Sequence, residues 1–288
     1  MGEVISVKNL RKTYSNGVEA VKGINLSVQN QLVHALLGPN GAGKTSTMKS
    51  ILGFIKFEGD IKVFGKNIDE VRNRISFVPE EKNFYTHLTP QKSIKMCKRL
   101  FKNFNDEEAF KLLKYFDIPI NKKIGSFSNG MKTSLYISLS LAQEADLYIF
   151  DEPTTGLDPI KRSDLLELIR QKIIDGKTVL YSSHIIPEVE KIADYISIMY
   201  KGRIIYSGFR DDIKEKFKLL YVPTEISHKI GIDTKNFFAK LIEDEVIVLL
   251  SNDHKQWESL SNHEDIEIKD VDLEEFFNTL IRGYNDVF

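Results

Sequence analysis

The chain has 288 residues, of which 42% are hydrophobic and 28% charged, as in a soluble globular protein with one large and one small domain or two medium ones. Its net charge of −1 gives no overall basic footprint for nucleic acid, and its single cysteine, Cys97, excludes an intrachain disulfide framework. No apolar run approaches the roughly 18 residues of a membrane span, and the N-terminus does not resemble a signal sequence, so we expect a cytoplasmic chain.

The N-terminal part of the chain is predicted to be rich in strands. Apolar and polar residues alternate in its first segments, and a turn at residues 15–17 follows Tyr14. The predicted elements are strands over 4–7, 20–28 and 32–37, a helix over 47–52 that stops at Gly53, and strands over 59–65 and 75–79. The strand over 32–37 is mostly apolar, as a buried strand is.

Residues 90–143 change to a helical period, and strands return after residue 146. The predicted elements are helices over 93–101, 107–116 and 128–142, a strand over 146–153, a helix over 160–174, a strand over 177–181, a short helix over 187–193 and a hairpin over 196–206. Strands separated by helical stretches predict an α/β fold with a largely parallel core.

The composition changes near residue 212. We expect a core domain over 1–212, with a helical subdomain over about 85–143, and a small accessory α+β domain over 213–288. In the accessory domain the pattern predicts a hairpin over 239–250, a strand over 266–268 and a helix over 273–281 that Asp272 opens.

Residues 38–45 read Gly-Pro-Asn-Gly-Ala-Gly-Lys-Thr and match the phosphate-binding template G-x-x-x-x-G-K-[ST] without a mismatch. Glycines let the backbone N–H groups approach a phosphate, and the following helix adds the positive end of its dipole. Lys44 supplies a positive charge for the outer phosphates, and the Thr45 hydroxyl is placed to bind Mg²⁺. The predicted nucleotide contacts here are Asn40, Gly41, Ala42, Gly43, Lys44, Thr45 and Ser46.

Two carboxylates, Asp151 and Glu152, end the apolar strand over 146–153. Phosphoryl hydrolysis needs a metal on the phosphates and a group that orients water. Asp151 is placed to hold Mg²⁺, and Glu152 to activate the attacking water. By itself, such a pair is more typical of a solvated strand end.

With these motifs in order, residues 3 to about 210 resemble the nucleotide-binding subunit of ABC transporters, with an antiparallel β subdomain and a helical signature subdomain. The matching segments are Tyr14 about 24 residues before the P-loop, residues 127–132 at the signature loop, 147–152 at the Walker B strand, 156–158 at the D-loop, and His184 at the switch histidine. Tyr14 and His184 also have plainer interpretations, as an edge-strand aromatic and a helix cap.

The resemblance implies a mechanism and partners. Two subunits, as a homodimer or with a different mate, would face each other head to tail and hold ATP and Mg²⁺ between the P-loop of one and Ser128, Asn129 and Gly130 of the other. Glu152 would be the base, His184 would steady the γ-phosphate, and Asp158 would couple the sites. The pair would power a bacterial exporter by binding a separate transmembrane permease at the inner face of the cell membrane.

The chain departs from the family pattern at two places. Glu80 occupies the position of the usual glutamine, where its carboxylate would join Thr45 and Asp151 near Mg²⁺, although Glu80 and Glu81 also fit a solvated loop. The signature loop has Asn129 where a glycine is common and Met131 where a glutamine is common.

Three other functions are alternatives to the exporter subunit. A soluble ABC-type ATPase acting on nucleic acid or ribosomes usually has two ATPase units or a coiled-coil insertion, and this chain has one P-loop. A GTPase would need Asn-Lys-x-Asp, and residues 121–124 fail at the last position. Intact Lys44, Asp151, Glu152 and His184 argue against a non-hydrolytic module.

Overall fold

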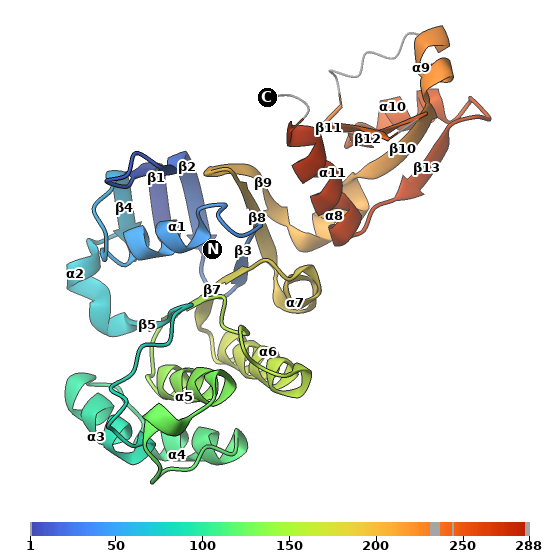
Figure 1. Cartoon of the computed structure of the whole chain (residues 1–288). Coiled ribbons are helices and arrows are strands. Elements are labelled where there is room, and N and C mark those ends of the chain that lie inside the picture. The colour runs from blue at the N-terminus through green and yellow to red at the C-terminus, as the bar shows by residue number, and fades with distance from the viewer. Residues whose placement is uncertain (1, 231–236, 244, 286–288) are drawn as a thin grey trace. The chain divides into compact units, whose positions relative to one another are not determined.

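The computed structural model describes residues 2–230, 237–243 and 245–285 (Figure 1). The chain forms two compact units. The first comprises Met1–Ala193 and Met199–Ile204, and the second comprises Asp194–Ile198 and Ile205–Phe288. Within the described residues, no helix combines the length and the apolar character that crossing a membrane requires.

The first unit contains an antiparallel three-stranded sheet in the order β2-β1-β4. Its strands are β1 (Glu3–Thr13), β2 (Glu19–Gln29) and β4 (Glu58–Val63). Val7 in the central strand lies opposite Leu26 on one side and Ile61 on the other. The sheet buries one face because apolar residues alternate with polar ones along β1 and β2.

A six-stranded sheet has the order β5-β6-β7-β3-β8-β9, and β5, β6, β7 and β3 pair in parallel. The strands are β3 (Val33–Leu37), β5 (Ile75–Val78), β6 (Leu147–Asp151), β7 (Thr178–Ser183), β8 (Tyr195–Tyr200) and β9 (Arg203–Phe209). All residues of β3, β6 and β7 are buried, as expected of parallel strands covered on both faces. The predicted α/β fold is confirmed.

Successive residues of the parallel strands point into two different hydrophobic cores. Ile149 joins a core with Leu26 of the antiparallel sheet and Met48 of α1 (Lys44–Ile51). Its neighbour Phe150 joins a core with Leu135 of the helices on the opposite face. Those helices are α3 (Pro90–Leu100), α4 (Asp106–Tyr115), α5 (Asn129–Leu141) and α6 (Pro159–Ile174); the short helices α2 (Ile68–Val71) and α7 (Ile186–Ile192) complete the unit.

The strand order explains why several candidate site residues lie at the same edge of the sheet. β5, β6, β7 and β3 are neighbours and run in the same direction, so their carboxyl ends meet at one edge. Glu152, His184 and Gly38 directly follow the ends of β6, β7 and β3, and Glu80 comes two residues after the end of β5. Open parallel sheets bind ligands at this edge.

The second unit contains an antiparallel sheet in the order β11-β12-β10-β13. The strands are β10 (Lys218–Pro223), β11 (Ala239–Glu243), β12 (Val246–Ser251) and β13 (Glu267–Asp270), and the helices are α8 (Arg210–Lys216), α9 (Thr224–Ile230), α10 (His254–Leu260) and α11 (Leu273–Asn285). The hairpin predicted over 239–250 is present as β11 and β12. The sequence patterns missed α8, β10, α9 and α10.

Candidate nucleotide site

The loop between β3 and α1 depends on glycine at one position in particular. Gly43 has φ of 108°, and a Cβ there would lie 2.4 Å from the Ala20 carbonyl oxygen and 2.7 Å from Met199 Cε. Another residue would therefore meet both backbone strain and a clash. Helix α1 begins directly after it, at Lys44, so the loop ends at a helix N-terminus suited to an anion.

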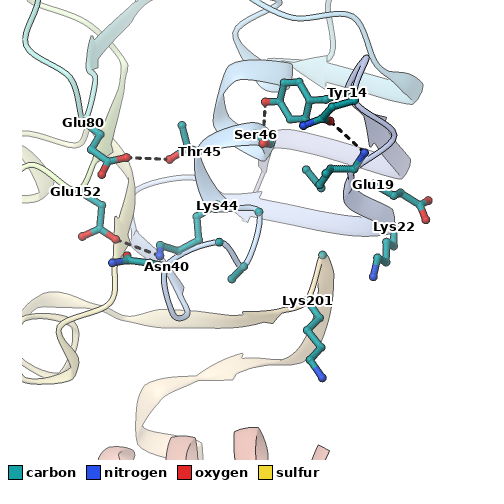
Figure 2. Close-up of a pocket in the computed structure, with 17 residues that line it drawn as sticks. Tyr14, Glu19, Lys22, Asn40, Lys44, Thr45, Ser46, Glu80, Glu152 and Lys201 are labelled. Carbon is teal, nitrogen blue, oxygen red and sulfur yellow. Dashed lines mark hydrogen bonds and ion pairs between the residues drawn. The ribbon is translucent and has the colours of Figure 1, made fainter. Parts of the chain in front are cut away.

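Lys44 is buried at the base of this loop. Its ammonium donates to the carbonyl oxygens of Gly38 at 2.7 Å and Pro39 at 3.2 Å, and it pairs with Glu152 Oε1 at 3.1 Å. Figure 2 shows Lys44 and Glu152 facing each other across the loop. The cation is thus positioned by acceptors of the chain itself before any phosphate arrives.

Asp151 is buried at the end of β6 and is held by two hydroxyls. Its Oδ1 accepts from Ser182 Oγ at 2.6 Å and from Thr45 Oγ1 at 3.2 Å. Burial raises the pKa of Asp151 above its ordinary value, and these two hydrogen bonds oppose that rise. Its other oxygen, Oδ2, is buried and has no hydrogen-bond partner among the described residues.

Thr45, Asp151 and Glu80 approach one another at this point. Glu80 Oε2 lies 3.5 Å from Thr45 Oγ1. A dashed line marks this contact in Figure 2. An all-oxygen set with an unpartnered carboxylate oxygen fits a hard divalent cation such as Mg²⁺. The fit concerns ligand chemistry, since hydroxyl and carboxylate oxygens are the groups that Mg²⁺ prefers.

Glu152 lies between two basic side chains. Its carboxylate contacts Lys44 through Oε1, and its Oε2 is 2.9 Å from His184 Nδ1. The backbone of Glu152 is left-handed, with φ of 45°, and its N–H donates to Ser182 Oγ at 3.0 Å. Left-handed non-glycine residues concentrate at functional sites, because the surrounding structure has to hold them.

A cleft of about 530 Å³ opens beside the loop and is large enough for a nucleotide. Tyr14 lies in its wall with its hydroxyl 3.0 Å from Ser46 Oγ, and Lys12 Nζ lies 4.7 Å from the centre of the Tyr14 ring. The cleft is lined by Tyr14, Asn16, Val18, Glu19, Ala20, Lys22, residues 40–46, Glu80, Glu152, Lys201 and Gly202. The predicted P-loop residues, Tyr14, Glu80 and Glu152 therefore line one cleft.

Among the residues that sequence reasoning missed at this site are three lysines and one serine. Lys22 and Lys201 line the cleft, and Ser182 links Asp151 to the Glu152 backbone. The Lys-Gly turn at 201–202 signals a hairpin, and tertiary hydrogen bonds hold it beside the loop: Gly202 N donates to the Ala42 carbonyl oxygen at 2.9 Å, and Lys22 N donates to the Gly202 carbonyl oxygen at 2.8 Å.

Lys82 is the third of these lysines. Its ammonium donates to the Glu80 carbonyl oxygen at 2.9 Å. Burial lowers the pKa of Lys82, while the charges of Asp151, Glu80 and Glu152 act to raise it. Lys82 therefore adds a positive charge to the acidic side of the site.

The predicted signature and D-loop residues lie elsewhere in the chain. Ser128 caps α5 by accepting from Met131 N at 3.2 Å, and Asp158 caps α6 by accepting from Lys161 N at 3.0 Å. The Lys161 N–H holds the pKa of Asp158 below its ordinary value. Gly130 packs so closely that a Cβ would lie 2.7 Å from the Gly156 carbonyl oxygen. Neither Ser128, Asn129, Gly130 nor Asp158 is among the described residues that line the cleft.

Comparison with known proteins places this geometry in a family. The ABC transporter family profile matches residues 21–155. The linearmycin resistance ATP-binding protein of Bacillus subtilis is 34% identical over 73% of this chain and 70% of its own length. The lantibiotic transport ATP-binding protein of Streptococcus pyogenes is 35% identical over 74% of this chain and 96% of its own length.

Solved structures agree. An ATP-binding subunit of an ABC transporter is 29% identical, with a TM-score of 0.67 over 74% of this chain and 92% of that chain. A bacterial ABC transporter cassette, described as dimeric, shares the fold at 24% identity, with a TM-score of 0.64 over 71% of this chain and 98% of that chain. The chain is therefore a member of the ABC transporter family and one of its ATP-binding subunits, which are ATPases coupled to transport.

Proposed function

We propose that this subunit hydrolyses MgATP through Lys44, Glu152 and His184 and thereby powers an exporter. The supporting observation is the buried array in which Glu152 contacts both Lys44 and His184 next to the P-loop. A γ-phosphate gives Lys44 a new partner in place of Glu152. Glu152 is then available to accept a proton from the attacking water, while His184 steadies the γ-phosphate.

Thr45, Asp151 and Glu80 are the residues that would hold Mg²⁺, which when bound neutralises phosphate charge and orients the β- and γ-oxygens. Tyr14 offers an aromatic face to adenine at the wall of the cleft. The main-chain N–H groups of residues 40–46 and the N-terminus of α1 would hold the phosphates. Ser182 fixes the Asp151 side chain relative to the Glu152 backbone, because its hydroxyl donates to Asp151 Oδ1 and accepts from the Glu152 N–H.

We infer that two subunits pair head to tail and complete each other's sites. Ser128 lies at the N-terminus of α5, a 13-residue helix whose dipole favours an anion. The cleft of the same chain lacks Ser128, Asn129, Gly130 and Asp158. A second copy would supply them to the γ-phosphate, and the shared fold of a dimeric cassette supports this arrangement.

We propose that the partner is a separate transmembrane permease, which keeps the pair at the inner face of the membrane. A cavity of about 250 Å³ lies beside the loop after β5 and includes Tyr85, Leu100 and Phe101, all exposed apolar side chains. The same loop carries Glu80 into the nucleotide cleft. Leu100→Glu should abolish copurification of a multi-span protein but leave ATP binding intact; retained copurification would exclude this surface.

A subunit-mixing experiment tests the head-to-tail site. Glu152→Gln removes the base, and Ser128→Asp keeps the helix cap but sets a negative charge against the γ-phosphate. Each variant alone should be inactive. The two variants are mixed, and ATP is then added. In each heterodimer, one site combines both substitutions and the other site contains neither of them.

The mixture should therefore recover ATPase activity. Mixing Glu152→Gln with the double variant Ser128→Asp/Glu152→Gln is the matched control, because no intact site can form. Ser128→Asn, which caps without a charge, should retain more activity than Ser128→Asp. Recovery no greater than in the control would contradict the shared site.

A further inference from the structure

The second unit contains a cavity that has no role in the proposed ATPase mechanism. Its volume is about 630 Å³, within the range of small-molecule sites. The lining residues all belong to the second unit and include Tyr206, Asp212, Glu215, Phe217, Phe238 and Trp257. They come from β9, α8, α10 and the segments beside them.

Aromatic rings form the apolar part of this cavity. Phe217 and Phe238 meet edge to face with ring centres 5.1 Å apart, and Tyr206 lies 5.9 Å from Phe217 and 6.2 Å from Phe238. Phe276 packs against all three rings and is fully buried. Phe238 nevertheless leaves 41% of its surface exposed. Covering this ring with an apolar ligand would remove unfavourable contact with water.

The cavity also carries a negative charge that the protein leaves uncompensated. Asp212 and Glu215 lie three residues apart on α8. Asp212 pairs at 2.9 Å with Lys216, which also lines the cavity, whereas the exposed Glu215 has no ion pair among the described residues, so the lining keeps one negative charge in excess. His254 also lines the cavity, is widely exposed and lies 4.8 Å from the Trp257 ring.

Two polar groups in the lining are suited to orienting a ligand. Burial, and next the charge of Asp212, raises the pKa of Tyr206 to about 12, so its hydroxyl stays neutral at physiological pH. Trp257 Nε1 is buried and has no hydrogen-bond partner among the described residues. A buried N–H donor without an acceptor is unfavourable, and a ligand acceptor would relieve it.

We propose that this cavity binds an amphipathic organic cation, whose apolar body covers Phe238 and Trp257 and whose positive charge is balanced by Glu215. Aromatic faces attract cations through their quadrupole, and the ammonium of Lys218 already lies 5.9 Å from the centre of the Trp257 ring. A phosphate or other anion is disfavoured by the same carboxylate. The site is separate from the proposed ATP site, which residues of the first unit form.

The sequence supplies a reporter, since Trp257 is the only tryptophan. The full-length protein, without nucleotide, is titrated with tetraphenylphosphonium while the tryptophan is excited at the red edge of its absorption. Tetraphenylborate has the same shape and the opposite charge, and is the matched control. We expect a saturable change in Trp257 fluorescence with the cation and at least about tenfold weaker binding of the anion.

Two variants assign the binding to this cavity. Glu215→Gln should weaken cation binding about threefold to tenfold, and Phe238→Leu, which keeps an apolar side chain, should weaken it similarly. Glu274→Gln changes an exposed carboxylate of α11 outside the lining and should leave binding unchanged. Circular dichroism verifies that each variant is folded.

Equilibrium dialysis of tetraphenylphosphonium provides a second readout that does not depend on fluorescence. Absence of saturable binding in both measurements would overturn the proposal. Equal affinity for cation and anion would also overturn it, as would a Glu215→Gln variant that binds like Glu274→Gln. ATP binding is measured separately, so none of these three failures bears on the ATPase function.

Discussion

The buried ion pair between Lys44 and Glu152 predicts that the loss of Lys44 destabilises the protein more than the loss of the Glu152 charge. Both side chains are only 5% exposed, with 3.1 Å between Lys44 Nζ and Glu152 Oε1. Lys44→Met leaves a carboxylate in the interior with His184 as its remaining partner, and breaking such a pair costs about 3–5 kcal/mol. Glu152→Gln leaves Lys44 with two carbonyl acceptors, so we expect a cost of only about 1–2 kcal/mol.

The double variant Lys44→Met/Glu152→Gln should be more stable than Lys44→Met alone, because no charge remains unpaired. The assay is calorimetry of the nucleotide-free protein in a chelator, following the transition of the first unit. At about 2–4 °C per kcal/mol, Lys44→Met should lower its Tm by about 6 °C or more. Equal losses for the two single variants, or additive losses in the double variant, would refute this reasoning.

Three further predictions concern the nucleotide site and the core. Tyr14→Ala should raise the Kd for ATP about fivefold to tenfold in a filter-binding assay, whereas Tyr14→Phe should stay near the parent value because the ring remains; equal effects would exclude stacking. In the absence of Mg²⁺, Lys82→Met should weaken ATP binding and Glu80→Gln should tighten it, and the double variant should return near the parent because the two charges cancel; an unchanged Kd in Lys82→Met would exclude this electrostatic role. Burial lowers the pKa of His34 to about 3, so the unfolded chain takes up the proton first as the pH falls below about 6.5, and stability is lost in that direction. In urea unfolding between about pH 5 and 7, His34→Gln should remove a slope of at most about 1.4 kcal/mol per pH unit; an unchanged slope would contradict the assignment.

The sequence patterns predicted most residues of the candidate nucleotide cleft because its components are local. The P-loop is one continuous segment, and Asp151 and Glu152 end an apolar strand whose burial is evident from composition. Parallel strand order then brings these segments to one edge. Ser182, Lys82 and Lys201 could not be predicted in the same way, since their roles depend on tertiary contacts that no local pattern encodes.

The second unit was harder to predict for two physical reasons. Its helices α8, α9 and α10 have seven residues each, about two turns, which is too short for a clear helical period. In addition, Leu220 of the inner strand β10 pairs with Leu249 and Ile268, which are distant in the sequence, so no local pattern indicates this pairing.

The final helix also runs past its predicted end at residue 281. Gly283 does not stop it but allows close packing, since a Cβ there would lie 2.4 Å from the Lys240 carbonyl oxygen. A glycine near a helix end is usually a stop signal. Here tertiary packing against β11 overrides that signal.

The most direct test of ATP-driven pairing is the mass of the Glu152→Gln variant in solution with and without MgATP. Without its base the variant should trap ATP, and the two copies should stay together. We expect the mass to double only with MgATP, and Ser128→Asp in the same chain should abolish the doubling. A variant that binds ATP and keeps the mass of one chain would contradict the proposal that ATP joins two copies of this subunit.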